Sequence, residues 1–518
     1  GGFIPQGRET TVSPPVGTMP LPECDDVELT ASGDIRPGEL VIVDLKGNPS
    51  KWSKRSVDLT GIGGMFALTD PEPEFVDINS RNEAVVTLQD NNHIVHVDLV
   101  DAEIIGNHSA STTWINKLDN TEEELGPQEN GLIEFVDGPL ERRREPDAVT
   151  FVGDDIAATA NEGDYEDELE NEGGSRGFTL FDRGGTVLFD VGMDFEYESA
   201  RAGHYNEGRS ENKGGEPEGI TFDRFGPRDV LFVGAERANA VGVYDLTDPT
   251  APQFVQLLPT GSGPEGFETI PSRGLLAVSA ENSEDGFPSM ITLYSGSRKN
   301  IAEYPQLVSD KELAGTPLPW VAMSGLAGTQ GDPDTIYGVS DSFLADGFIY
   351  TINVSDGRGV ITNRTRVYDP NDLAAPLDFF PDLEGIAVAP EGGFWLASEG
   401  RKSSGVVVRD NALIKTDASG VVEQYITLPD DLVAGATNSG FEGIAVTKEN
   451  GSTKFVYAVV QLEWNAGTNG VLGDPDHHVK IVRWDMENEE WAYIHYEKAA
   501  PATPWVGLSE ITLLPDGT

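Results

Sequence analysis

The sequence contains almost no cysteine and no long apolar run. Among its 518 residues there is one cysteine, Cys24, so no disulfide can close within the chain. A structural thiol and a bond to a partner outside the chain are both open for Cys24. No apolar stretch approaches the ~18 residues that a membrane-spanning helix needs. We therefore expect no membrane insertion.

Basic residues are also scarce. The chain has 35 Lys and Arg residues against 88 Asp and Glu residues, which gives a formal net charge of −53. A surplus of this size repels nucleic acid and anionic membrane surfaces, so neither is an expected partner. It favours solubility, cation binding or life in salty water, where salt screens the repulsion between like charges.

Helical periodicity is rare, whereas glycine and proline are plentiful, with 59 and 33 residues. Short apolar stretches separated by turn residues are typical of β-strands, so we predict an all-β fold. The chain begins Gly1-Gly2-Phe3 without a methionine or a signal-type segment, and it stops in a turn at residues 515–518. We expect a processed or trimmed product whose natural polypeptide continues beyond residue 518.

One short phrase recurs along the chain: an acidic or polar residue, a small residue, an apolar strand, a tight turn and a second strand. The opening polar residues of the eight phrases are Asp77, Asp147, Glu218, Glu265, Ser324, Glu384, Glu442 and Glu510. They lie 47 to 71 residues apart, and a four-stranded propeller blade needs roughly 40 to 50 residues. We therefore predict a β-propeller of about seven four-stranded blades. An eight-bladed ring and two smaller propellers are the alternatives.

The domain organisation follows from this repeat. We expect an extended arm at residues 1–35, a propeller at 36–518, ring-closing strands at 36–70, and two halves at 71–310 and 311–518. The strand at Leu40–Leu45 is expected to complete the blade that begins at Glu510.

The second strand of most phrases also ends in a polar residue. These strand ends are Ala160-Asn161-Glu162, Gly234-Ala235-Glu236-Arg237, Ser279-Ala280-Glu281-Asn282, Val339-Ser340-Asp341-Ser342, Ala397-Ser398-Glu399-Gly400-Arg401 and Val460-Gln461-Leu462-Glu463. In a propeller the first strand of every blade lines a central channel, and these strands all run in the same direction. Carboxylates at equivalent positions are then expected to converge into a ring at one mouth of the channel.

Converging carboxylates need protons, arginine partners or hard cations. Calcium takes six to eight oxygen ligands in loose geometry, and it can hold a phosphate and polarise a water. The expected metal ligands are Asp147, Glu162, Asp164, Glu218, Glu265, Glu384, Glu442 and Glu510. Arg237 and Arg401 are expected to clamp phosphate oxygens, and Glu384 and Glu442 to be catalytic. Alternatively, each carboxylate accepts backbone N–H bonds from the adjoining blade.

Four other patterns are present in the sequence. The acidic run at 161–172 fits a solvated loop or a calcium loop that includes Glu162 and Asp164, but it does not match the EF-hand spacing. The loop at 473–478 fits a polar turn better than a metal site. His93 and His96 lie three apart in a predicted strand, so they face opposite sides and do not chelate one ion. The G-x-S-x-G string at 173–177 lacks the strand before it and the helix after it that a serine hydrolase requires.

Two family resemblances rest on the repeated phrases. Residues of about 311–518 resemble the "esterase-like activity of phytase" family through the phrases at 382–386, 394–399, 440–444 and 507–511. Residues of about 70–297 resemble the choice-of-anchor I surface proteins, whose propeller is often described as alkaline-phosphatase-like, through 160–164, 215–219 and 243–249. The resemblance implies secreted or surface-bound propellers, some of them associated with calcium-dependent hydrolysis of phosphate esters. Ser324 and Ala148 depart from the phrase, and no dense lysine set for phytate is present.

The leading functional prediction is a secreted, periplasmic or cell-surface propeller that binds calcium and hydrolyses a small phosphate ester. A non-catalytic surface or matrix propeller that binds an extracellular partner protein is the second hypothesis. A lactonase-type propeller hydrolase is the third. Turnover of p-nitrophenyl phosphate with calcium, compared with turnover in chelator, separates the first two.

Overall fold

A computed structural model describes residues 38–121, 132–164, 173–281, 290–296, 306–312, 314–329, 331–370, 381–465, 473–499 and 506–514. The predicted N-terminal arm, Cys24 and most of the acidic run at 161–172 lie outside these residues. The described fold is all-β, as predicted, with seven large sheets, three two-stranded sheets and two short helices in the described residues. We number the large sheets 1 to 7 in chain order.

Sheets 1 to 4 form the N-terminal half. Sheet 1 contains β3 (Pro73–Ile78), β4 (Glu83–Leu88), β5 (His93–Asp98) and β6 (Glu103–Ser109). Sheet 2 contains β9 (Pro146–Val152), β10 (Ile156–Asn161), β11 (Gly177–Asp182) and β12 (Val187–Asp190). Sheet 3 contains β13 (Pro217–Phe225), β14 (Arg228–Ala235), β15 (Ala240–Asp245) and β16 (Gln253–Pro259). Sheet 4 contains β17 (Pro264–Ile270), β18 (Leu275–Ala280) and β19 (Met290–Ser295).

Sheets 5 to 7 form the C-terminal half. Sheet 5 contains β21 (Met323–Thr329), β22 (Asp332–Ser340), β23 (Phe348–Asn353), β24 (Gly359–Arg366) and β20 (Leu307–Ser309), which pairs in parallel with β24. Sheet 6 contains β25 (Leu383–Val388), β26 (Phe394–Ser398), β29 (Ala412–Thr416) and β30 (Val422–Thr427). Sheet 7 contains β31 (Phe441–Glu449), β32 (Ser452–Val460), β33 (His478–Asp485) and β34 (Glu490–Glu497).

The smaller elements connect and cover these sheets. The two-stranded sheets pair β1 (Glu39–Asp44) with β2 (Ser53–Asp58), β7 (Thr112–Ile115) with β8 (Leu140–Arg143), and β27 (Arg401–Ser403) with β28 (Val406–Arg409). The helices are α1 (Asp194–Arg201) and α2 (Asp430–Val433). Short 3-10 turns lie at Pro49–Lys51, Glu207–Arg209 and Pro271–Arg273.

Most large sheets are four-stranded antiparallel meanders, which is the topology of a propeller blade. The second and third strands are apolar runs buried on both faces, as in β26 with Phe394, Trp395 and Leu396, because the sheets stack face to face. The fourth strands, such as β16 and β34, are largely exposed. The repeated phrase is the first pair of strands in each sheet, as the sequence predicted.

Stacking is continuous within each half. The first strands β3, β9, β13 and β17 pack in succession, and so do β21, β25 and β31. A small residue after the opening residue permits this approach. A Cβ on Gly385 would lie 2.5 Å from the carbonyl oxygen of Glu442 in the next sheet, and a Cβ on Gly325 would lie 2.8 Å from that of Glu384. The glycine of the phrase is therefore required by packing between neighbouring sheets.

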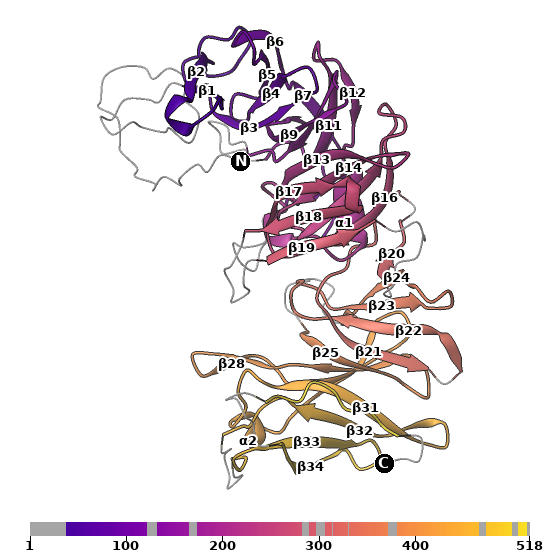
Figure 1. Ribbon diagram of the computed structural model, residues 1–518. Coiled ribbons are helices and arrows are strands. Elements are labelled where there is room, and N and C mark those ends of the chain that lie inside the picture. Colours follow the sequence, from indigo (N-terminus) through magenta and orange to yellow (C-terminus); the bar gives the residue numbers. More distant parts are fainter. Residues whose placement is uncertain are drawn as a thin grey trace, which may run out of the picture.

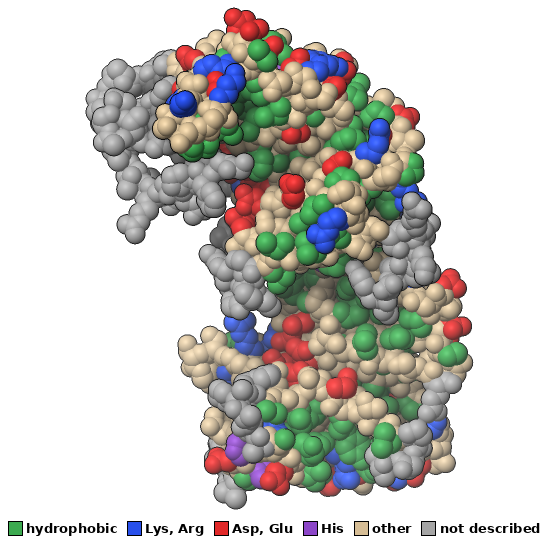
Figure 2. Space-filling view, in the orientation of Figure 1, with side chains coloured by type: hydrophobic (Ala, Val, Ile, Leu, Met, Phe, Trp, Pro, Cys, Tyr) green, Lys and Arg blue, Asp and Glu red, His purple; other side chains and the backbone are tan. Residues whose placement is uncertain are grey.

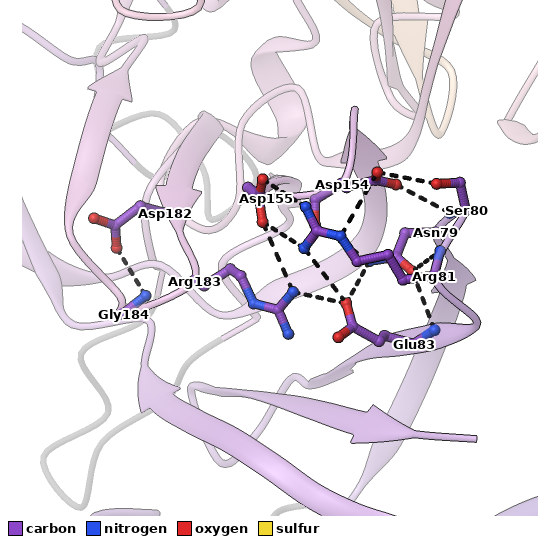
Figure 3. Close-up of polar contacts among 9 residues, drawn as sticks. All are labelled: Asn79, Ser80, Arg81, Glu83, Asp154, Asp155, Asp182, Arg183 and Gly184. Carbon is purple, nitrogen blue, oxygen red and sulfur yellow. Dashed lines mark hydrogen bonds and ion pairs between the residues drawn. The ribbon is translucent and has the colours of Figure 1, made fainter. Parts of the chain in front are cut away.

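The turns at the other end of sheets 1 and 2 are tied by ion pairs (Figure 3). Arg81 Nη1 lies 2.6 Å from Asp155 Oδ1, and Arg183 Nη1 lies 2.6 Å from Glu83 Oε2. The backbone N–H of Ser80 donates to Asp154 Oδ1. Exposed pairs contribute little singly, but a network fixes the relative position of the two sheets.

The halves are joined through α1. Tyr197 and Ala200 of this helix share an apolar cluster with Phe348 and Tyr350 of sheet 5. The indole N–H of Trp320 donates to the carbonyl of Arg201 at 2.9 Å. The succession of stacked first strands therefore runs within each half, and the junction between the halves is built from α1 and the apolar cluster.

The sheets do not close into a ring, which corrects the predicted ring closure. Figure 1 shows sheets 1 and 7 at opposite ends of a curved stack. Strand β1 pairs with β2, and its Leu40 and Ile42 pack on the core of sheet 1 instead of completing a blade with Glu510. Glu510 lies beside Gly443 of β31, as an eighth phrase stacked on sheet 7. The described residues contain seven large sheets, five of which have the four antiparallel strands of a blade, and these sheets do not form a closed propeller.

Candidate metal centres

A bulge at the start of each first strand aims an acidic side chain away from the ladder. In sheet 3, Pro217 pairs with Ala235 and Gly219 pairs with Gly234, so Glu218 has no partner opposite it. The same irregularity leaves Glu265 and Glu384 unopposed in sheets 4 and 6. Bulges commonly redirect one side chain in this way. The opening carboxylates of the phrases are therefore placed by a repeated local geometry.

A second polar residue, acidic in five of the seven sheets, follows the second strand and lies across from the first. The pairs are Glu74 and Gln89, Asp147 and Glu162, Glu218 and Glu236, Glu265 and Glu281, Ser324 and Asp341, Glu384 and Glu399, and Glu442 and Gln461. In sheets 3 to 7 the backbone N–H of the second residue of the pair donates to a backbone carbonyl two positions before the first residue of the pair. In sheet 3, for example, the N–H of Glu236 donates to the carbonyl of Glu216. The amide of Gln461 likewise donates to Glu442.

The N-terminal half brings its acidic groups around one cavity of about 330 Å³. Its lining residues are Glu72, Glu74, Gln89, Asp90, Asp147, Glu162, Asp164, Glu218, Glu265 and Glu281. Lys213 supplies a positive charge at one side, with its Nζ 2.8 Å from Glu162 Oε1 and 2.5 Å from Asp164 Oδ2. We call the lining residues, together with Lys213, Glu216 and Glu236, the first cluster.

Burial and crowding raise the pKa values of carboxyls in the first cluster. Burial, together with the charges of Glu162 and Glu236, raises the pKa of Glu218 to about 11. Burial and a hydrogen bond with Glu281 raise the pKa of Glu265 to about 7. Asp147 is 8% exposed, and burial raises its pKa well above the ordinary value.

Three oxygens of the first cluster lie within 4.8 Å of one another, on Glu162, Glu216 and Glu218. Glu216 is fully buried and is held by two arginines, with Arg209 Nε 2.6 Å from its Oε1 and Arg237 Nε 3.0 Å from its Oε2. The charge of Glu216 is therefore balanced by ion pairs with two arginines, whereas Glu218 has no such ion pair among the described residues.

The C-terminal half repeats this arrangement with different residues. Oxygens of Asp341, Asp382 and Glu384 lie within 4.8 Å of one another. In both triads the first acid, Glu162 or Asp341, follows the second strand of one sheet. The other two acids come from the start of the next sheet: Glu218 or Glu384 lies at the bulge, and Glu216 or Asp382 lies two residues before it. We call Asp341, Asp382, Glu384, Glu399 and Glu442 the second cluster.

Hydrogen bonds hold the second cluster only in part. Glu384 Oε2 accepts from Ser324 Oγ at 2.5 Å, and Asp382 Oδ1 accepts from the N–H of Ser342 at 3.1 Å. Glu399 Oε1 accepts from the N–H of Gly440 at 2.7 Å. These bonds confirm that some of the carboxylates satisfy backbone groups, the alternative that the sequence left open.

Burial raises the pKa values of the second cluster as well. Burial and the charges of Asp382 and Glu384 raise the pKa of Glu399 to about 7. Burial and the charges of Glu384 and Glu399 raise the pKa of Glu442 to about 8. A cation with several oxygen ligands would relieve the same crowding by neutralising the charges.

The β27–β28 hairpin carries two arginines, of which Arg409 contacts the second cluster. Arg409 Nη2 donates to Asp382 Oδ2, and Arg409 Nε donates to the carbonyl of Glu399 at 3.0 Å. Arg401 pairs with Arg409 across the hairpin and is exposed. Figure 2 shows basic side chains next to a patch of acidic ones in the lower half of the molecule.

The predicted site residues thus fall into two clusters, not one ring, which corrects the single-axis prediction. Asp147, Glu162, Asp164, Glu218 and Glu265 lie in the first cluster, and Glu384 and Glu442 lie in the second. Arg237 contacts Glu216 and Glu236, so it belongs to the first cluster. Glu510 lies on the strand-like segment next to β31 and is exposed.

One opening residue was misassigned from the sequence. Pro73 pairs with Leu88 at the bulge, so Glu74 is the equivalent of Glu218, and Glu74 lines the cavity. Asp77 instead accepts the N–H of Phe151 at 2.6 Å. The Pro-acid dipeptide shared by Glu74, Asp147, Glu218 and Glu265 was the signal that identifies this position.

The remaining sequence patterns have structural roles. Asp474 Oδ1 lies 2.5 Å from Lys480 Nζ, and both side chains are buried, so the loop at 473–478 is held by an ion pair. The G-x-S-x-G string at 173–177 is followed by strand β11 and not by the helix that a serine hydrolase requires. No helix among the described residues is long and apolar enough to cross a membrane.

Comparison with known families also separates the N-terminal part of the chain from the C-terminal part. Residues 318–518 match the family described as "Esterase-like activity of phytase". Residues 46–173 and 168–249 match the choice-of-anchor I domain. The two halves match two different families. Both matches confirm the resemblances drawn from the repeated phrases. We use the name phytase-like half for sheets 5 to 7 and choice-of-anchor half for sheets 1 to 4; the second match ends at residue 249, so sheet 4 lies outside it.

Solved structures offer only distant likenesses, and no curated protein sequence matches the chain. Hydrazine synthase from Kuenenia stuttgartiensis is 12% identical, with a TM-score of 0.26, over 86% of this chain and 91% of the other. Virginiamycin B lyase from Staphylococcus aureus is 12% identical, with a TM-score of 0.23, over 83% and 86%. PorZ from Porphyromonas gingivalis is 12% identical, with a TM-score of 0.25, over 95% and 54%. At these TM-scores the likenesses carry no argument about this chain.

Proposed function

We propose that the phytase-like half hydrolyses phosphate esters with calcium held by the second cluster. The observation that carries the proposal is the triad of Asp341, Asp382 and Glu384, whose oxygens lie within 4.8 Å of one another and whose Asp382 is bonded by Arg409. The family match of residues 318–518 supports an esterase-type activity for this half.

The donor set of the second cluster fits calcium. Asp341, Asp382 and Glu384 would hold the ion, because carboxylates supply the hard oxygen ligands that calcium takes in flexible geometry. The charge of Glu384 acts on both Glu399 and Glu442, so these two carboxyls lie near enough to the triad to add further oxygens. When bound, calcium supplies positive charge that neutralises phosphoryl oxygens and activates water.

The chain's own residues would bind and orient the substrate. Arg401 is exposed and has a planar guanidinium that can bond two phosphate oxygens. Arg409 holds Asp382 in place and limits the negative charge that a phosphate would meet. Glu442 lies among the same carboxyls, and it is the residue that would donate a proton to a departing alkoxide.

The choice-of-anchor I match supports a cell-surface or extracellular location for the protein. Calcium reaches millimolar concentration outside cells, which suits a weak carboxylate site. A substrate at that location would be a small phosphate ester, because the surface beside the second cluster offers two arginines and no described cluster of lysines.

Hydrolysis of p-nitrophenyl phosphate by the full chain tests the proposal. We expect turnover in calcium and its loss in chelator, with recovery when calcium is restored. Absence of turnover in both conditions would favour the second candidate, a non-catalytic surface propeller. The observation that favours this second candidate is that Asp382 already has Arg409 and Ser342 as partners.

A further inference from the structure

The first cluster is a built cavity that the hydrolytic proposal does not use. Ten residues line it, and all of them are Glu, Asp or Gln. Glu74, Asp147, Glu218 and Glu265 come from four successive first strands, so neighbouring sheets fix their spacing. Rigid strands hold ligand groups more accurately than loops do.

The carboxyl of Asp147 is buried in this cavity without a hydrogen-bond partner among the described residues. Asp147 is more than nine-tenths buried and lines the cavity, and its carboxyl makes no hydrogen bond or ion pair with any described residue. Buried polar groups are nearly always partnered. A buried carboxyl that faces a polar cavity without a partner indicates a ligand in that cavity.

Positive charge from the chain is concentrated at one side of the cavity. Lys213 contacts Glu162 and Asp164, while Arg209 and Arg237 are engaged by Glu216. Lys213, Arg209 and Arg237 form no ion pair with Asp147, Glu218 or Glu265, although the charge of Lys213 acts on Asp147. The expected ligand therefore carries positive charge and fits beside Asp147 and Glu218.

The lining decides between a metal ion and an organic cation. A polyamine or a lysine side chain has methylene groups that pack on apolar surface, and none of the ten lining residues is apolar. A hard divalent cation with its water molecules needs only oxygen ligands. We propose that the choice-of-anchor half binds a calcium-type divalent cation in this cavity, with Asp147, Glu162 and Glu218 as ligands.

The relation between the two halves supports this assignment. The triad of Glu162, Glu216 and Glu218 is built at the same positions of the repeat as Asp341, Asp382 and Glu384. The first cluster adds Asp147 and Glu265 on the flanking sheets. The proposal does not rest on hydrolytic activity in the phytase-like half, because it concerns binding by a separate set of side chains.

Calcium titration of the full chain by isothermal calorimetry tests the proposal. The starting protein carries Asp382→Asn and Glu384→Gln, which remove the triad of the second cluster. We expect this protein to retain calcium binding. Adding Asp147→Asn or Glu218→Gln should weaken that binding at least tenfold. Each substitution keeps the shape of the protonated acid, so we expect the fold to persist, as checked by circular dichroism in chelator.

The matched control is Glu268→Gln on the same strand as Glu265, where the side chain is exposed and outside the cavity. It should leave calcium binding unchanged. Lys213→Met gives an independent test, because removing the resident positive charge should tighten binding. The proposal is wrong if the starting protein binds no calcium, if Asp147→Asn and Glu218→Gln bind calcium as well as it does, or if spermidine binds in the cavity and calcium does not.

Discussion

Arg409 bonds the carboxylate of Asp382 from across the β27–β28 hairpin. The same acid is one of three whose oxygens approach one another within 4.8 Å. Arg409 therefore satisfies Asp382 and also lowers the negative charge that attracts a cation. Replacing Arg409 by Gln should strengthen calcium binding at the second cluster by at least about twofold, because a repelling charge is removed. Calorimetry of Arg409→Gln with Glu218→Gln, to silence the first cluster, measures this change. Weaker calcium binding would show that Arg409 mainly positions Asp382.

Arg401 gives a prediction about substrate. A guanidinium that makes two charge-assisted bonds contributes about 1.5–3 kcal/mol, so Arg401→Ala should raise KM for p-nitrophenyl phosphate roughly tenfold or more. Calcium binding should stay the same, because Arg401 is not among the metal ligands. Arg358→Ala, at another exposed arginine, serves as the control and should leave KM unchanged. An unchanged KM in Arg401→Ala would remove Arg401 from the proposed site.

The glycine of the phrase predicts a stability difference. A Cβ on Gly385 would meet the backbone of Glu442 and Ile444 in the next sheet. Gly385→Ala should therefore lower the free energy of unfolding by about 1–3 kcal/mol, the usual cost of overpacking. Gly328→Ala is the matched control, since a Cβ there has no heavy atom within 4 Å. Denaturant melts of both variants measure the difference, and equal midpoints would contradict the close approach of the sheets.

Buried histidines predict how stability depends on pH. His96 is buried against the rings of His108 and Phe151, and burial, with the charges of His108 and Arg183, lowers its pKa to about 4. Between pH 6.5 and pH 4, His96 therefore binds a proton in the unfolded chain but not in the folded chain. The contribution of His96 is fully present above pH 6.5 and is lost as the pH falls toward 4, by up to about 3 kcal/mol.

The variant His96→Phe tests this dependence. Its free energy of unfolding should fall less steeply than that of the wild type between pH 6.5 and pH 4, because it lacks one titrating group. Parallel slopes in denaturant melts over this range would show that His96 is protonated in the folded protein.

The sequence predicted the class of fold and the local placement of the acids. Repeated phrases identified the first two strands of each sheet, and the polar residues after the second strands do lie across from the opening acids, as Glu218 and Glu236 show. These features depend on short-range patterns of apolar residues and turns, which are written directly in the sequence. Ring closure depends on contacts between distant segments, and the repeat carried no information about it.

The division into two clusters was missed for a physical reason. Helix α1 and the apolar cluster around Tyr197 and Tyr350 join the halves, and no repeat marks this junction in the sequence. Arg409 was overlooked because it reaches Asp382 by way of a hairpin inserted between the second and third strands of sheet 6. The three-dimensional path of this hairpin brings Arg409, and not the strand-end residue Arg401, into contact with Asp382 of the triad.

Calcium-dependent hydrolysis by variants of the triad tests the central claim most directly. With p-nitrophenyl phosphate, Asp382→Asn and Glu384→Gln should each lower kcat/KM about 100-fold or more, in the range found when a group that stabilises charge is removed. Glu268→Gln, an exposed acid in the choice-of-anchor half, should match the wild type. Wild-type turnover that survives both triad substitutions would contradict the assignment of hydrolysis to Asp341, Asp382 and Glu384.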